Sequence, residues 1–358
     1  MDLEEILTGA VTKEASDIHI TPGRPVTYRL VGDLVSIGSQ VLTPQDTESF
    51  SKQITTEAQR KKIEEVGGID FGFSFKDKAR FRVSCFKSQG HYACVLRLLP
   101  SKFYNFKDIG LPPQLIEVLN LPRGLVLVTG PTGSGKTTTL ATMLNYINET
   151  FPKHIITAED PIEFVHSHKQ GVITQREVGD DVPTFSEAIV KSLRQDPDVI
   201  LIGEMRDLMT MESAIRAAET GHLVFSTLHT TGAARTVDRI IDVFPSHQQA
   251  QIRVQLASTI VAVISQVLLP RMDGKGRVAA FEIMFATPAI RNLIREGKTY
   301  QILSEIQTGS RYGMIMLDDY LKQLYSQGMI SLDAAQEVAI EPKELMLALS
   351  KIQPAGKK

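Results

Sequence analysis

The stretch GLVLVTGPTGSGKTTTL, residues 124–140, restricts the fold of this chain more than any other part of the sequence. Gly130 is followed after four residues by Gly135, Lys136 and Thr137, which is the G-x-x-x-x-G-K-[ST] pattern of a phosphate-binding loop. An apolar run precedes the loop and a helix-forming run follows it, as the pattern requires. Glycines let backbone N–H groups wrap a phosphate, and the positive end of the helix dipole faces the anion. The stretch therefore predicts a nucleotide-binding α/β domain.

Two side chains of this loop have distinct expected roles. Lys136 is expected to contact the β and γ phosphates of ATP, and the Thr137 hydroxyl to coordinate Mg²⁺. The other loop residues expected to contact the nucleotide are Thr132, Gly133, Ser134, Gly135 and Thr138. ATP and Mg²⁺ are thus the cofactors that the sequence predicts.

The rest of the chain after Gly124 supports an α/β domain. Short runs that are apolar at nearly every position alternate with longer helical patterns, which is typical of parallel strands covered on both faces. The strand-like runs are GLVLVTG, HIITAED, DVILIGE and HLVFSTLH. The apolar run LASTIVAVISQVLL from Leu256 is too short to cross a bilayer and is expected to be a buried helix. From Pro288 onward, one helical pattern follows another.

The residues before Pro100 show a different pattern. Alternating apolar and polar runs separated by PG and GD turns predict strands, and TPQDTESFSKQI and TTEAQRKKIEEVGG predict two helices. A small α+β domain with an antiparallel sheet is expected. The predicted organisation is an N-terminal domain at 1–100, a linker at 101–122, an ATPase domain at 123–287, a helical region at 288–350 and a tail at 351–358.

Composition argues against several classes of protein. The chain has 39 basic and 41 acidic residues and a net charge of −2, so no overall charge favours nucleic acid or an anionic membrane. Aromatic residues make up only 6% and tryptophan is absent, which disfavours base stacking. Cys85 and Cys94 do not form a zinc-binding pattern. The N-terminal residues lack the features of a signal peptide. We therefore expect a cytoplasmic location, with no nucleic-acid partner and no direct membrane insertion.

ATP hydrolysis requires a carboxylate that orients or deprotonates water near the γ phosphate. In open α/β sheets, ligands bind beyond the carboxyl ends of the strands. HIITAEDPIEF supplies Glu159, Asp160 and Glu163 at such a position. DVILIGEMRD has Gly203 in place of the usual magnesium-binding aspartate, but Glu204 directly follows its apolar run. Asp207 precedes a predicted helix and is expected to cap it.

Two histidines flank the core of the strand-like run HLVFSTLH. His222 begins the run and His229 ends it, and an odd spacing in a strand sends side chains to opposite faces. A shared metal site is therefore not expected. His229 lies at the predicted active-site end, where it would sense the γ phosphate or hydrogen-bond a catalytic acid. A purely structural hydrogen bond is the alternative for both residues.

Five motifs occur in a recognisable order: ASDIHI, GPTGSGKTTT, TAEDPIEF, LIGEMRD and GHLVFSTLHT. With them the chain resembles the secretion ATPase superfamily, and within it the PilT-like type IV pilus retraction ATPases. AIRNLIRE, residues 289–296, resembles a segment characteristic of the retraction branch. The resemblance implies a RecA-like P-loop ATPase domain, a smaller PAS-like α+β N-terminal domain, a helical C-terminal region and a ring of six subunits.

The resemblance also implies roles for individual residues. Glu163 would be the general base, and Glu204 the Walker B glutamate near Mg²⁺. Arginines of the N-terminal domain would contact the nucleotide, and the candidates are Arg80, Arg82 and Arg97. Arg80 and Arg82 share one face of their predicted strand. The acidic and histidine boxes of the family further include Glu159, Asp160, His222 and His229.

These features predict a homohexameric motor that retracts type IV pili by nucleotide-driven domain closure. Its expected partner is an inner-membrane platform protein at the pilus base, reached from the cytoplasmic face. The alternatives are a pilus-assembly or type II secretion ATPase, a RecA-like nucleic-acid motor, and a nucleotide-dependent regulator. Relatives of the first kind usually carry a four-cysteine zinc insertion, whereas no cysteine follows Cys94. Many relatives have Asn after TLHT, whereas this chain has Thr231 and Gly232, so no role is assigned there.

Overall fold

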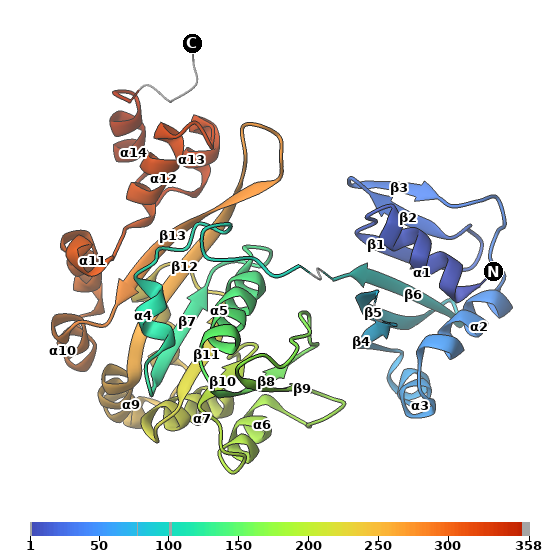
Figure 1. Cartoon of the computed structure of the whole chain (residues 1–358), viewed down its shortest axis with the longest axis horizontal. Coiled ribbons are helices and arrows are strands. Elements are labelled where there is room, and N and C mark those ends of the chain that lie inside the picture. The colour runs from blue at the N-terminus through green and yellow to red at the C-terminus, as the bar shows by residue number, and fades with distance from the viewer. Residues whose placement is uncertain (1, 77, 100–101, 353–358) are drawn as a thin grey trace. The chain divides into compact units, whose positions relative to one another are not determined.

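The computed structural model describes residues 2–76, 78–99 and 102–352 (Figure 1). Residues 353–358 of the predicted tail, and residues 100 and 101 at the predicted domain boundary, lie outside the described residues. The chain divides into two compact units. The first unit is Met1–Lys102 with Asp160–Val165, and the second is Phe103–Glu159 with His166–Lys358. The first unit therefore includes a short segment of the predicted acidic box.

The first unit is an α+β fold with an antiparallel sheet, as predicted. Its strand order is β3-β2-β1-β6-β5-β4. The strands are β1 (Asp17–Ile20), β2 (Thr27–Leu30), β3 (Asp33–Ser36), β4 (Gly68–Phe75), β5 (Ala79–Ser88) and β6 (His91–Leu98), and the helices are α1 (Leu3–Thr12), α2 (Pro44–Ile54) and α3 (Glu57–Val66). Thr43 and Thr56 begin α2 and α3 with capping boxes. Tyr28 and Phe81 are buried in the core between the sheet and the helices.

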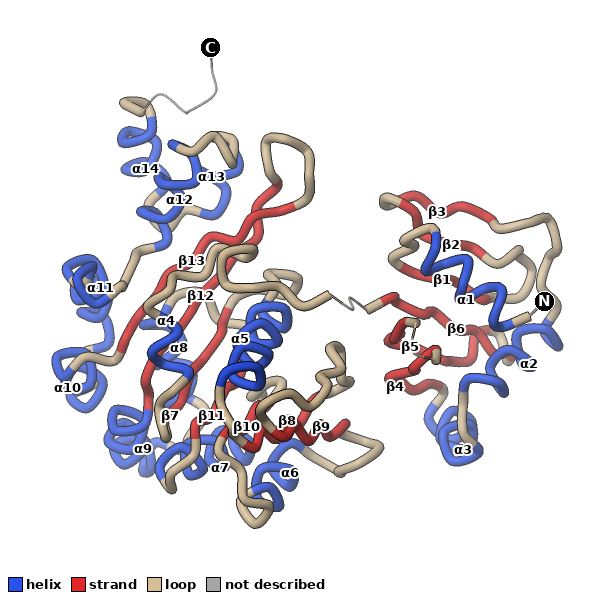
Figure 2. Tube along the Cα trace, in the orientation of Figure 1, coloured by secondary structure: helices blue, strands red, loops and turns tan. Residues whose placement is uncertain are grey.

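The second unit is built on a largely parallel sheet. Its strand order is β13-β12-β7-β11-β10-β8-β9, and the neighbouring strands are parallel except for β12 and β13. The strands are β7 (Gly124–Thr129), β8 (His154–Glu159), β9 (Val172–Glu177), β10 (Val199–Ile202), β11 (Leu223–Leu228), β12 (Ile260–Pro270) and β13 (Arg277–Phe285). Leu125 and Leu127 of β7 join one apolar core, and Val126 and Val128 join the other. Helices cover both faces of the sheet (Figure 2), which explains why its strands are apolar at nearly every position.

The α-helices of the second unit lie before, between and after these strands. They are α4 (Leu115–Leu119), α5 (Lys136–Thr150), α6 (Phe185–Ser192), α7 (Leu208–Glu219), α8 (Ala233–Asp242), α9 (Ser246–Thr259), α10 (Pro288–Glu296), α11 (Ile302–Thr308), α12 (Leu317–Ser326), α13 (Leu332–Val338) and α14 (Pro342–Leu349). Phe106, Leu111 and Leu115 of the predicted linker pack into one core with β7 and α5. The predicted end of the linker at residue 122 and the predicted end of the ATPase domain at residue 287 remain predictions. None of the helices in the described part of the chain has the length and apolar character needed to span a bilayer.

The run from Leu256 is not a single buried helix, so that prediction was wrong. α9 ends at Thr259, and β12 begins at Ile260. The residues from Ile260 onward are rich in β-branched side chains, which favour extended backbone. Periodicity alone does not distinguish a short buried strand from a buried helix. We also did not predict β9 or β13, and β13 forms an antiparallel hairpin with β12.

α10 carries the AIRNLIRE motif and packs against α9. Ile290 and Ile294 are completely buried in the core of the second unit. The Nη1 atom of Arg291 donates to the carbonyl oxygens of Ala257 at 2.6 Å and Ser258 at 2.9 Å. These carbonyls belong to the last turn of α9, where C=O groups have no partner within the helix. The motif therefore fixes the end of α9 immediately before β12 begins.

Candidate active site

The phosphate-binding loop connects β7 to α5 and has the backbone shape that its glycines predict. Gly133 and Gly135 have φ angles of 77° and 89°, which residues with a Cβ rarely adopt. A Cβ on Gly130 would lie 2.2 Å from the carbonyl oxygen of Gln266. The loop is therefore packed directly against the backbone of β12, and only glycine fits at its first position.

The side chain of Gln266 holds the loop from the neighbouring strand. Its Nε2 donates to the carbonyl oxygen of Ser134 at 2.5 Å, and its Oε1 accepts from the Thr139 hydroxyl at 2.8 Å. Gln266 is buried, so water does not compete for these hydrogen bonds. The Ser134 hydroxyl is also buried, and it has no hydrogen-bond partner among the described residues.

Lys136 begins α5 and its side chain folds back into the loop. The ammonium donates to the carbonyl oxygens of Gly130 at 2.9 Å and Pro131 at 3.0 Å. Burial lowers the pKa of Lys136, and the charge of Glu204 acts in the opposite direction. Of the remaining loop residues, Thr132 is exposed, whereas Thr137 and Thr138 are half-buried.

Glu204 lies just beyond the carboxyl end of β10 and meets two basic side chains. Its Oε2 lies 2.7 Å from the Nε of Arg206, with which it forms an ion pair, and 3.5 Å from the Nε2 of His229. The Glu204 side chain is 17% exposed, so its carboxylate is partly shielded from water. The structure thus brings Glu204 and His229 together, from the ends of neighbouring strands.

Gly203, which stands in place of the usual aspartate, is closely packed at this strand end. The Gly203 N–H donates to the carbonyl oxygen of Ala158 at 2.8 Å, and its own carbonyl accepts from the Thr227 hydroxyl at 2.7 Å. A Cβ at this position would lie 3.3 Å from that Ala158 oxygen, which is closer than most Cβ contacts. A side chain here would press on the backbone of β8. The next residue, Glu204, provides the carboxylate instead.

The acidic box is divided between the two units. Glu159 ends β8 and is buried, and its Oε1 accepts from the Thr157 hydroxyl at 2.6 Å and from the Nε2 of Gln175 at 3.1 Å. Asp160 and Glu163 belong to the segment grouped with the first unit. Asp160 is exposed and Glu163 is half-buried. Two side-chain hydrogen bonds therefore anchor Glu159 in the second unit.

A row of charged side chains crosses the sheet of the first unit. The register of the strands places Arg82 opposite Arg97, Arg97 opposite Asp17, and Asp17 opposite Arg29. The Nε of Arg97 donates to Asp17 at 2.9 Å, and the Nε of Arg29 lies 3.9 Å from the other Asp17 oxygen. Asp17 is the acidic residue of the ASDIHI motif. This motif therefore supplies the counter-charge for one of the predicted nucleotide-contacting arginines.

Arg80 lies on the same face of β5 as Arg82, as predicted, because the two positions are separated by one residue. Its Nε donates to the carbonyl oxygen of Ile162 at 2.8 Å, and its Nη1 donates to the Ser74 hydroxyl at 2.8 Å. Ile162 belongs to the Asp160–Val165 segment. Arg80 therefore contacts the short segment that carries Glu163.

The structure does not bring His222 to the phosphate-binding loop. His222 lies at the amino end of β11, opposite to His229, and its Nδ1 is 3.0 Å from the carbonyl oxygen of Ala217 in α7. Asp207 has the predicted capping role, because its side chain accepts from the Thr210 N–H at 2.9 Å at the start of α7.

Comparison with known proteins identifies the family to which this site belongs. Residues 1–316 match the type II/IV secretion system protein family. The chain is a member of that family. This secretion ATPase is 49% identical over 343 residues to the type IV pilus retraction ATPase PilT of Pseudomonas aeruginosa, over 96% of this chain and 99% of that protein. It is 49% identical over 311 residues to a twitching motility protein of Neisseria gonorrhoeae, over 87% of this chain and 83% of that protein.

The secretion ATPase also matches a solved structure over nearly its whole length. The crystal structure of the pilus retraction motor PilT with bound ADP has a TM-score of 0.90 and 47% sequence identity, and it covers 96% of this chain and 98% of that one. This agreement confirms the mixed α/β fold and the use of a nucleotide.

Two residues near the nucleotide loop of the secretion ATPase were missing from the sequence predictions. Arg206 lies two residues after Glu204 in LIGEMRD, so its closeness in the sequence could have predicted an ion pair with Glu204. Gln266 is separated from its partner Thr139 by 127 positions, and it lies in β12, where the sequence pattern predicts a helix. No local pattern pointed to its contact with the loop.

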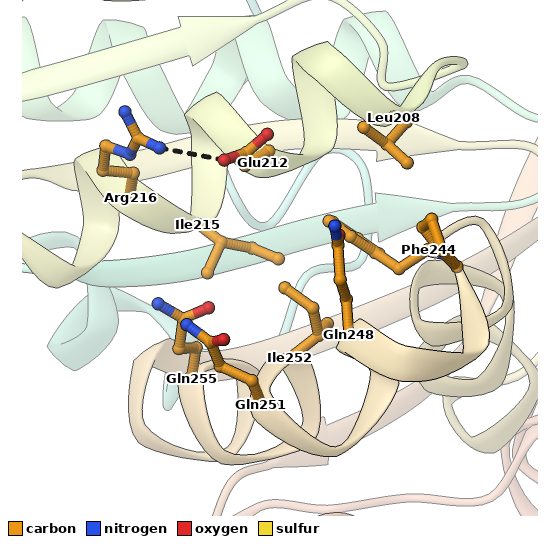
Figure 3. Close-up of a pocket in the computed structure, with 10 residues that line it drawn as sticks. Leu208, Glu212, Ile215, Arg216, Phe244, Gln248, Gln251, Ile252 and Gln255 are labelled. Atoms are coloured by element: carbon orange, nitrogen blue, oxygen red, sulfur yellow. Dashed lines mark hydrogen bonds and ion pairs between the residues drawn. The ribbon is translucent and has the colours of Figure 1, made fainter.

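A separate groove of about 340 Å³ lies between α7 and α9 of the secretion ATPase (Figure 3). Ile215 and Ile252 face each other across it, and Gln248, Gln251 and Gln255 of α9 line one side. Glu212 and Arg216 form an exposed ion pair on α7 at 2.9 Å. None of these residues contributes a hydrogen bond to the phosphate-binding loop in the described part of the chain.

Proposed function

We propose that this ATPase is the motor that retracts type IV pili. The observation that carries the proposal is the extent of the similarity to PilT, which includes 99% of the Pseudomonas aeruginosa protein. Supporting it, the AIRNLIRE segment forms α10, and the chain has no cysteine after Cys94 that would suggest a zinc insertion. ATP hydrolysis would provide the free energy for pulling the pilus fibre inward.

In this proposal the motor works as a homohexamer at the cytoplasmic face of the inner membrane. Its partner is the platform protein at the base of the pilus. Solved structures of related secretion ATPases support the shared fold of the subunits, which is the unit from which such a ring is built. Neither nucleic acid nor insertion of this chain into the bilayer has a part in the mechanism.

The residues around the loop suit a nucleotide and Mg²⁺. Gly133 and Gly135 have the positive φ angles that let backbone N–H groups wrap a phosphate, and the buried Ser134 hydroxyl lacks a partner among the described residues. Thr137 and Glu204 offer oxygen atoms, which Mg²⁺ prefers together with water and substrate phosphates. A cluster of three or more His, Cys, Asp or Glu able to hold a metal is absent from the described residues. When bound, the ion would be held by Thr137 and Glu204 and would neutralise charge on the phosphates of the nucleotide.

In this mechanism Lys136, Glu163 and Glu204 would have separate roles. Lys136 exchanges its two loop carbonyl partners for oxygens of the β and γ phosphates. Glu163 accepts a proton from the water that attacks the γ phosphorus, and the bond to the β–γ bridging oxygen breaks to release ADP and phosphate. Glu204, which lies beside Arg206 and His229, would help to hold the metal ion rather than activate the attacking water. The two glutamates thereby divide the tasks of metal binding and proton transfer.

The arginines of the first unit would make hydrolysis depend on domain closure. Arg82 and Arg97, which are opposite each other on adjacent strands, would neutralise charge that develops on the phosphates in the transition state. Arg80 has a hydrogen bond to Ile162 and would hold the segment of the general base instead. Closure would complete the site, and release of ADP would reopen it.

Substitution of a glutamate of the second unit and of an arginine of the first unit tests this mechanism. Glu204→Gln should lower kcat for ATP by about a hundredfold or more. Glu212→Gln is the matched control, because Glu212 forms an exposed ion pair on α7 away from the loop. Arg97→Ala should also lower kcat, whereas Arg29→Ala, which removes the more distant partner of Asp17, should not. Near-normal rates for both Glu204→Gln and Arg97→Ala would contradict the assignment.

A cellular experiment tests the direction of the work. Cells that lack this chain should assemble pili but fail to retract them, and the Glu204→Gln protein should not restore retraction. Loss of the pili themselves would instead indicate an assembly ATPase. Stimulation of the purified enzyme by single-stranded DNA would indicate a nucleic-acid motor.

A further inference from the structure

A cavity of about 410 Å³ lies in the second unit between the start of α8, the β12–β13 hairpin and the C-terminal helices. Its walls are mainly apolar and include Ala234, Val267, Leu303, Leu317, Ala339 and Ile340. Small-molecule sites have volumes of roughly 300–1,000 Å³ and combine apolar walls with a few placed polar groups. This cavity therefore has the size and lining of a ligand site, and it is distinct from the phosphate-binding loop.

The carboxyl group of Glu282 on β13 lies in the wall of this cavity, and the residue is 1% exposed. Its Oε1 accepts from the Ala233 N–H at 2.7 Å, at the N-terminus of α8. Its Oε2 is buried and has no hydrogen-bond partner among the residues that the structure describes. Such an atom is unfavourable in a folded protein unless something else satisfies it. The pKa of Glu282 is raised, chiefly by burial.

The charged groups that act on Glu282 are Arg235 and Asp318. Arg235 also lines the cavity and is exposed, so water screens its charge. The two Asp318 oxygens accept from the backbone N–H groups of Ile340 at 2.8 Å and Glu341 at 2.9 Å, which ties one wall of the cavity to α12. Glu282 is the acidic residue among the described residues that line the cavity.

We propose that this cavity binds a small organic cation, with an apolar body against the walls and a protonated amine on the free Oε2 atom of Glu282. The amine would provide the missing hydrogen bond and a counter-charge together, which is the stronger kind of hydrogen bond. A carboxylate ligand would meet the like charge of Glu282. A divalent metal ion would find one carboxylate and apolar walls, which do not form the oxygen cage that such an ion requires.

The position of the cavity couples it to the nucleotide site. The Ser265 hydroxyl accepts from the Gly232 N–H at 2.9 Å, and Glu282 accepts from the next N–H, so together they hold the first turn of α8. This turn follows His229 closely in the chain. Gln266, which also lines the cavity, holds the phosphate-binding loop. A ligand in the cavity would therefore contact the residues that hold the first turn of α8 and the residue that holds the phosphate-binding loop. Its binding is for this reason linked to the binding of the nucleotide.

The test uses the full chain with benzylammonium as the probe and benzoate, which has the same ring and the opposite charge, as the comparison. Binding is measured by ligand-observed NMR. Benzylammonium should bind the unmodified chain, and benzoate should not. Ala339→Phe, directly after α13, and Ala234→Leu, in α8, fill the cavity from two different segments and should each abolish binding. Glu282→Gln should weaken it about tenfold or more. Gln251→Ala, in the groove between α7 and α9, should leave it unchanged.

Each result bears on a separate part of the proposal. Undetectable binding to the unmodified chain, or unchanged binding to both filled variants when circular dichroism shows that they are folded, would overturn the site. Equal binding of benzoate would overturn the role of Glu282. By linkage, ADP should change the affinity for benzylammonium, and an unaltered affinity would overturn the coupling. The measurement does not depend on which fibre the motor moves, so it is independent of the proposed function.

Discussion

The buried imidazole of His166 should make the stability of the second unit depend on pH. His166 directly follows the Asp160–Val165 segment and is 9% exposed. Its ring lies against that of Phe103, with 4.6 Å between the ring centroids. Its Nδ1 has no hydrogen-bond partner in the described part of the chain. Burial, with a smaller effect from the charge of Lys169, lowers the pKa of His166 to about 4.

The sign and size of the effect follow from this pKa. A histidine in an unfolded chain has a pKa of about 6.5, so the unfolded state takes up the proton first as the pH falls. The stabilisation is fully present above about pH 6.5 and is lost progressively toward pH 4. A pH of about 5 lies roughly 1.5 units below the pKa of the unfolded-state histidine and above that of His166 in the folded state. Protonation of the unfolded chain therefore lowers the free energy of unfolding by about 2 kcal/mol at this pH.

The assay is urea unfolding followed by far-UV circular dichroism at about pH 7 and about pH 5. His166→Phe keeps a ring against Phe103 but cannot be protonated, so its loss of stability between the two pH values should be smaller by about 2 kcal/mol. His247→Phe removes an exposed histidine and is the control. Equal pH dependence in the unmodified chain and in His166→Phe would refute the reasoning.

Three further predictions concern the loop and the first unit. Gln266→Leu removes both side-chain hydrogen bonds to the loop, so KM for ATP should rise about tenfold in steady-state kinetics, and an unchanged KM would contradict this role. Gly130→Ala places a Cβ 2.2 Å from a carbonyl oxygen, so ADP binding measured by calorimetry should be lost; retained affinity would show that β12 can move away. Asp17→Asn weakens the ion pair with Arg97. Because the Arg97 side chain is 66% exposed, the free energy of unfolding should fall by only about 1 kcal/mol. Thermal unfolding measures this change, with exposed Asp33→Asn as the control.

Local features of the fold were predictable because their partners are close in sequence. Thr43, Thr56 and Asp207 each accept a backbone N–H three residues ahead, so a short pattern contains both partners. The proximity of Glu204 and His229 followed from a more general rule, since both stand at the carboxyl ends of parallel strands.

Contacts that depend on distant pairing were not predictable in this way. The strand β12 requires β7 on one side and β13 on the other, and its apolar run gave no periodicity that excluded a helix. Because that strand was missed, the contact of Gln266 with the loop was missed too. The grouping of Asp160–Val165 with the first unit likewise arises from tertiary contacts that the chain order does not reveal.

The close packing of Gly130 on β12 has a practical consequence for following this motor in real time. Loop and strand touch through their backbones, so a displacement of one is transmitted to the other, and the hairpin extends from there to an exposed turn that includes Met272. The chain has no tryptophan. A single indole introduced as Met272→Trp would therefore be an optical reporter without background, placed on the surface but mechanically connected to the site where the nucleotide binds.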